Sequence, residues 1–130
     1  MSQALLVVSV PGKGRGVVAG RRFGRGELIE RAPVVVLSPA DWDVARQTNV
    51  ARYCFLWGRG GHQAGIALGT GSLFNHSYTP NALARPLVRE RLMEFVALRD
   101  IEQDEEITIN YNGDPDDRAP VGFRVRERMR

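Results

Sequence analysis

A dense group of polar side chains lies between two apolar segments, from Leu73 to Ala82. The stretch reads Leu-Phe-Asn-His-Ser-Tyr-Thr-Pro-Asn-Ala, so it offers amide, imidazole and hydroxyl groups in close succession. Polar groups that leave water cost free energy unless they find hydrogen-bond partners. The stretch is therefore typical of a buried or half-buried polar turn in which each group needs a hydrogen-bond partner. Such departures from local sequence rules are common at functional sites.

Two other segments have the residue types to complete such a site. Glycine alternates with other residues from Gly12 to Gly16, which lets the backbone turn tightly or approach a ligand closely. This segment lacks the phosphate-binding and dinucleotide-binding spacings, so a plain hairpin turn is an equal alternative. Tyr111 ends a segment, 106–111, in which polar and apolar residues alternate as in a half-buried strand. Taken alone, Tyr111 is interpreted as a tyrosine that packs at a strand end.

The elements that must position these residues are short. Apolar runs bounded by glycine and proline predict strands at 5–10, 34–37, 52–57, 92–98 and 106–111. Ser38 followed by Pro39 predicts the start of a short helix that ends before Tyr53. With no long helical pattern and 130 residues, the sequence predicts one mostly-β domain with its own core.

Composition and charge limit the classes of function. The formal net charge is +3, and Lys13 is the only lysine among the basic residues. A cluster of arginines near the end either binds an acidic partner or is a solvated terminus: Arg124, Arg126, Arg128 and Arg130. The single cysteine, Cys54, excludes a disulfide within the chain, and we interpret it as a small buried apolar residue. No metal site, signal peptide or membrane span is expected, so we predict an intracellular protein.

Three segments together resemble the signature of the SET-domain protein lysine methyltransferases. They are Gly14–Ala19, Phe74–Asn81 with Asn-His-Ser-x-x-Pro-Asn, and Glu105–Tyr111 with Glu-Glu-Ile-Thr-x-x-Tyr. Their order and spacing agree with the family, and the short length resembles the minimal stand-alone SET proteins of viruses and bacteria. The resemblance implies a SET domain over residues 1–118 and a basic C-terminal tail over 119–130 that contributes to a lid.

The family resemblance also implies fold, chemistry and partners. The fold would be a β-clip of small sheets whose C-terminal segment forms a pseudoknot. S-adenosylmethionine would be the methyl donor, and a lysine of a histone or another basic protein the acceptor. A second copy of the chain would close the substrate channel in a homodimer, without direct nucleic-acid or membrane binding. The protein would be nuclear if it acts on host chromatin and cytoplasmic if it is bacterial.

Site residues carry over from the resemblance one by one. Tyr111 would be the catalytic tyrosine, and Tyr53 would be the aromatic of the lysine channel, with packing in the core as its alternative. Phe123 would cover the adenine. The residues that would bind the cofactor are Lys13, Gly14, Arg15, Asn75, His76, Tyr111 and Phe123.

The chain also departs from the family pattern. Asn110 replaces the aspartate that often precedes the catalytic tyrosine, and Ala32 replaces a channel aromatic. Ala84 falls near the position that controls the degree of methylation, where a small residue leaves room for more methyl groups. Glu105 and Glu106 are interpreted as a solvated turn. The alternatives are a SET-like module that binds a protein or cofactor without catalysis, and a basic adaptor that acts through its arginine tail.

Overall fold

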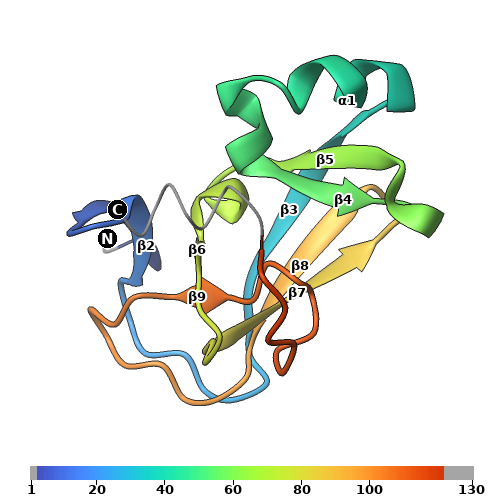
Figure 1. Cartoon of the computed structure of the whole chain (residues 1–130). Coiled ribbons are helices and arrows are strands. Elements are labelled where there is room, and N and C mark those ends of the chain that lie inside the picture. Colours follow the sequence, from blue (N-terminus) through green and yellow to red (C-terminus); the bar gives the residue numbers. More distant parts are fainter. Residues whose placement is uncertain (1–2, 122–130) are drawn as a thin grey trace.

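The computed structural model describes residues 3–121, and within them the strands form three sheets (Figure 1). The order is β1-β2 in the first sheet, β4-β5-β3-β8-β7 in the second and β6-β9 in the third. The predicted mostly-β class is therefore confirmed. The strands are β1 Leu5–Val10, β2 Gly14–Ala19, β3 Leu28–Leu37, β4 Cys54–Trp57, β5 Gln63–Ala67, β6 Asn75–His76, β7 Ala82–Leu87, β8 Leu92–Ala97 and β9 Thr108–Ile109.

The glycine-rich segment forms the turn and the start of the second strand in the β1-β2 hairpin. The antiparallel register runs from Leu5 opposite Ala19 to Val10 opposite Gly14. Gly12 and Gly14 both have a φ of +77°, a conformation that residues with a Cβ rarely adopt. The hairpin alternative is correct for the backbone, and this turn places the side chains that follow it beside the third sheet.

The five-stranded sheet is organised around β3, which has different neighbours along its two halves. Its first half pairs with β8 and its second half, from Val34, pairs with β5. The sequence predicted only 34–37 as strand, whereas β3 begins at Leu28 and continues through Pro33, which cannot donate a ladder hydrogen bond. Pro33 is tolerated because it lies where the neighbouring strand changes. The core beneath this sheet includes Phe74 and Phe95, whose ring centroids are 4.6 Å apart.

Short helical turns lie between the strands from β3 to β6. The helix α1, Pro39–Ala45, begins as predicted, with the Ser38 hydroxyl accepting a hydrogen bond from the Asp41 N–H at 3.1 Å. Three 3-10 helices follow: η1 Asn49–Tyr53, η2 Arg59–Gly61 and η3 Gly71–Leu73. Tyr53 is the last residue of η1, so the strand predicted from residue 52 begins only at Cys54. Cys54 is buried, as predicted, and its thiol donates to the Val50 carbonyl at 3.4 Å.

The third sheet joins the polar stretch to the C-terminal segment. Its two short strands run parallel, with Asn75 opposite Thr108 and His76 opposite Ile109. The predicted strand over 106–111 is shorter than expected because its backbone groups have three sets of partners. The Ile107 N–H donates to β2, β9 pairs with β6, and the Tyr111 N–H donates to a side chain. We call the place where β6 and β9 meet the crossing (Figure 1). Its hydrogen bonds account for the buried polar character of the stretch.

No helix in the described range 3–121 has the length and apolar character needed to cross a membrane.

Candidate active site

Asn75 is held in one orientation by the glycine-rich segment and the C-terminal segment. Its side chain is buried, and its amide nitrogen donates to the Arg15 carbonyl at 3.1 Å and to Glu106 Oε2 at 2.8 Å. A Cβ on Gly16 would lie 2.6 Å from Asn75 Nδ2 and 2.7 Å from Glu106 Oε2. Gly16 is therefore needed for close approach, and what approaches its backbone is the protein's own buried amide and carboxylate.

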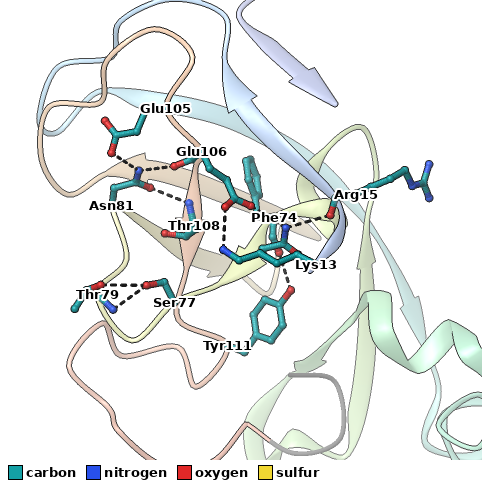
Figure 2. Close-up of polar contacts among 11 residues, drawn as sticks. Lys13, Arg15, Phe74, Ser77, Thr79, Asn81, Glu105, Glu106, Thr108 and Tyr111 are labelled. Carbon is teal, nitrogen blue, oxygen red and sulfur yellow. Dashed lines mark hydrogen bonds and ion pairs between the residues drawn. The ribbon is translucent and has the colours of Figure 1, made fainter. Parts of the chain in front are cut away.

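Glu106 forms an ion pair with Lys13 of the hairpin turn. Lys13 Nζ lies 2.9 Å from Glu106 Oε1, and Figure 2 shows the two side chains pointing toward each other. The Glu106 side chain is only 20% exposed. Its neighbour Glu105 contacts Asn81 and forms an ion pair with Arg99 at 2.8 Å. The interpretation of these two glutamates as a solvated turn is therefore wrong, because the partners of Glu106 are distant in sequence.

Asn81 holds the C-terminal segment in place. Its side chain is 2% exposed, and its Oδ1 accepts a hydrogen bond from the Thr108 N–H at 2.8 Å. Its Nδ2 donates to the Glu106 carbonyl at 2.8 Å and to Glu105 Oε2 at 3.2 Å. The sequence motif contained this asparagine, but the motif alone did not show that it binds backbone.

His76 positions Tyr111 through its ring. Its Nδ1 accepts a hydrogen bond from the Tyr111 N–H at 3.0 Å, and its ring packs edge-on against Tyr78. Burial, together with the nearby charge of Lys13, lowers the pKa of His76 below its ordinary value and favours the neutral ring that this hydrogen bond requires. Within the described residues, the buried Nε2 of His76 has no hydrogen-bond partner. An orphaned buried nitrogen at this place fits a site that takes a ligand.

Tyr111 lies between the polar crossing and an apolar cavity. Its hydroxyl donates to the Phe74 carbonyl at 2.8 Å, as drawn in Figure 2. Its ring lines a cavity of about 300 Å³, called here the Tyr111 cavity, whose walls include Phe55, Ala84 and Met93. The walls of the cavity are mostly apolar, and the Tyr111 phenol, Asn110 and Asn112 add polar groups, so it suits an aliphatic side chain that ends in a polar group.

A smaller cavity lies beside the hairpin turn. It has a volume of about 80 Å³ and is called here the Lys13 cavity; it is lined by Lys13, Gly14, Arg15, Arg52, Tyr53 and Leu73. The structure thus brings together three of the residues predicted to bind the cofactor. It places Tyr53 here, whereas Phe55 lines the Tyr111 cavity. Tyr53 ends a 3-10 helix, so the period-two alternation of β4 does not extend back to it.

The remaining predicted residues have varied settings. Asn110 is buried, and its side chain donates to the Asp117 carbonyl at 2.7 Å while accepting from the Asn112 N–H at 2.9 Å. An aspartate could accept but not donate there, so the asparagine shapes the turn that follows Tyr111. Ala32 is buried in the core, and Ala84 lines the Tyr111 cavity. Phe123 lies outside the described residues. In the part of the chain that is described, no cluster of three or more His, Cys, Asp or Glu side chains could hold a metal ion.

Comparison with known proteins decides the family. The sequence profile described as the SET domain matches residues 14–112, which include β6, β9 and Tyr111. The chain belongs to the SET-domain family. A relative, the histone-lysine N-methyltransferase of Schizosaccharomyces pombe that is specific for H3 lysine-37, is 35% identical over 100 residues. The match covers 76% of this chain and 67% of that protein. The SET-domain family is one of protein lysine methyltransferases, and the predicted family is confirmed.

Solved structures show the same fold. A candidate histone methyltransferase of Plasmodium falciparum has a TM-score of 0.65 at 24% identity, covering 85% of this chain and 95% of that one. A SET8 protein of Cryptosporidium has a TM-score of 0.66 at 22% identity, covering 85% and 57%. A chain of the Polycomb Repressive Complex 2 from Chaetomium thermophilum has a TM-score of 0.67 at 18% identity, covering 85% and 15%. These SET-domain likenesses confirm the predicted fold.

Proposed function

We propose that this protein transfers a methyl group from S-adenosylmethionine to a lysine side chain of a histone. Membership of the SET-domain family supports the enzyme class. The observation that carries the site assignment is the place of Tyr111. Its ring lines an apolar cavity, while its hydroxyl and backbone are fixed by Phe74 and His76.

The residues present fit a bound methyl donor beside the hairpin turn. Gly14 has open space where a Cβ would stand, and the buried His76 Nε2 lacks a partner in the described structure. Lys13, Gly14, Arg15, Asn75 and His76 are the residues that would hold the donor, and Tyr111 would lie at its reactive end. When bound, S-adenosylmethionine supplies an electrophilic methyl group on a sulfonium sulfur. Phe123 as a cover for the adenine stays a prediction.

The chain's own residues prepare the acceptor amine. The apolar walls of the Tyr111 cavity remove water from an entering lysine, and desolvation disfavours its charged form. A neutral amine has the lone pair that nucleophilic attack requires. The Tyr111 hydroxyl donates to the Phe74 carbonyl, so its oxygen can accept a hydrogen bond from an amine N–H and orient that lone pair. Holding the reacting groups in line is the main contribution such a site makes to rate.

The relatives and the exposed surface support proposals for the substrate and the assembly. The S. pombe relative is named for a histone lysine, which supports a histone acceptor and a place on chromatin for this protein. Leu56 lines the Tyr111 cavity and is 68% exposed. We expect a second copy of the chain to cover this side. Light scattering that finds a fully active monomer would contradict the homodimer.

The test of the function is Tyr111→Phe, which removes only the hydroxyl. We expect methyl transfer to a histone, followed with radiolabelled donor, to fall by about 100-fold or more, because a preorganised polar group at the reacting atoms is lost. Donor binding in calorimetry should stay within about twofold. The matched control is Tyr78→Phe, since the hydroxyl that it removes donates to the Ala119 carbonyl at 3.1 Å. Folded native protein that binds no donor, or Tyr111→Phe with native turnover, would refute the proposal.

A further inference from the structure

Glu106 connects three segments that are distant in sequence. One carboxylate oxygen pairs with Lys13 Nζ at 2.9 Å, and the other accepts from Asn75 Nδ2 at 2.8 Å. The Glu106 backbone is held by Asn81 Nδ2 at 2.8 Å and bridges to Val18. The hairpin turn, the polar stretch and the segment that leads to Tyr111 therefore meet at a single side chain.

Glu106 is the ion-pair partner of Lys13, which lines the Lys13 cavity. The described residues that line this cavity include no acidic side chain. Figure 2 shows the Arg15 side chain extending away from the crossing, whereas Lys13 turns toward Glu106. The Glu106 side chain is 20% exposed and that of Lys13 is 36% exposed, so solvent screens their interaction only in part.

We propose that Glu106 is a positioning residue for the methyl-donor site: it neutralises Lys13 so that a cationic donor can bind, and it fixes the Asn75 amide. This inference rests on the proposed function. S-adenosylmethionine carries a positive sulfonium, whereas its demethylated product, S-adenosylhomocysteine, has a neutral thioether and otherwise the same groups. If Lys13 loses its partner, its charge opposes the sulfonium compound and leaves the thioether compound less affected.

The test compares the dissociation constants of these two ligands by calorimetry. Glu106→Gln keeps the length of the side chain and an oxygen that can accept from Asn75, but it removes the charge. We expect the ratio of the S-adenosylmethionine constant to the S-adenosylhomocysteine constant to rise about fivefold, the order expected for one partly screened charge at short range. Adding Lys13→Met to Glu106→Gln should return this ratio to near the native value.

Lys13→Met alone gives a test of opposite sign, which does not need Glu106→Gln to fold. It leaves the Glu106 carboxylate without its cation, so the same ratio should fall below the native value. Lys13→Arg keeps a cation beside Glu106, so its ratio should lie closer to the native value than that of Lys13→Met. The matched control is Glu27→Gln. It removes an exposed ion pair in which Arg21 Nη2 lies 2.7 Å from Glu27 Oε2.

The outcomes separate the inference from the function on which it rests. If the folded native protein binds neither ligand, the proposed function fails. If the native protein binds both, and the ratio in Glu106→Gln and Lys13→Met equals that of the Glu27→Gln control, the charge role of Glu106 is refuted. A loss of affinity that is equal for the two ligands would show a purely structural role and would also overturn the inference.

Discussion

Replacing Asn81 with alanine removes the side chain that holds the C-terminal segment against the polar stretch. The Thr108 N–H and the Glu106 carbonyl would each lose a hydrogen bond of 2.8 Å. A buried backbone group left without a partner costs about 1–3 kcal/mol, so the two together cost about 2–6 kcal/mol. Domains of this size are stable by only about 5–15 kcal/mol. The substitution should therefore take away a large part of the free energy of unfolding.

Equilibrium unfolding in urea measures this loss. We expect the Asn81→Ala midpoint to move to a much lower urea concentration. The control is Asn112→Ala, which removes an exposed hydrogen bond of 2.8 Å to the Ala119 carbonyl and should cost less than about 1 kcal/mol. Asn81→Asp keeps the acceptor for Thr108 but puts a carboxylate beside Glu105, so it should be less stable at neutral pH than at acidic pH. An Asn81→Ala variant within about 1 kcal/mol of the native protein would refute the reasoning.

Three further predictions concern packing and pH. Gly16→Ala should abolish donor binding in calorimetry because a Cβ would lie 2.6 Å from the Asn75 amide; Gly24→Ala, with open surroundings, should bind normally. Burial raises the pKa of Glu30 despite its hydrogen bonds from Thr70, so its contribution to stability is present at acidic pH and lost as the pH rises through the folded pKa. Glu30→Gln should thus raise the free energy of unfolding more at about pH 7 than at about pH 4; equal gains would contradict this. Burial and the nearby lysine lower the pKa of His76. The contribution of the neutral His76 ring to stability is therefore present above the ordinary histidine pKa of about 6.5, and it is lost as the pH falls through the lower pKa of the folded state. Methyl transfer should fall in that acidic range, because protonation of His76 Nδ1 breaks the hydrogen bond that it accepts from the Tyr111 N–H. A flat pH–rate profile there would contradict the role of His76 in positioning Tyr111.

The sequence predicted the parts of the site whose identity lies in short motifs. The polar stretch, the glycine-rich turn and Tyr111 were found because each breaks a local pattern or matches a family signature. The structure places all three around one crossing. The helix start at Ser38 was also predicted, because an N-cap depends only on nearby residues.

Features that depend on distant partners were not predictable from local pattern. Glu106 has a hydrogen-bond partner in Asn75 and an ion-pair partner in Lys13, and nothing in the local sequence indicates either. Two adjacent glutamates after a turn are usually solvated, so the local pattern favoured the wrong interpretation. Phe55 was missed as a wall of the Tyr111 cavity because the boundary between η1 and β4 at Tyr53 is set by tertiary packing. The division of the chain at residue 118 stays a prediction.

The parallel pairing of β6 with β9 has a consequence for the order of folding. The pairing joins residues 75–76 to 108–109, so it closes a loop of about thirty residues. Closing this loop costs conformational entropy, which contacts made elsewhere must offset. The five-stranded sheet contains neither β6 nor β9, so we expect it to form without this pairing, whereas the placement of Tyr111 depends on His76 of β6. Hydrogen exchange at the Ser77 and Thr108 amides, both bonded across this crossing, should therefore report the fraction of molecules that are catalytically competent. Mild denaturant should abolish methyl transfer at concentrations that leave the five-stranded sheet folded.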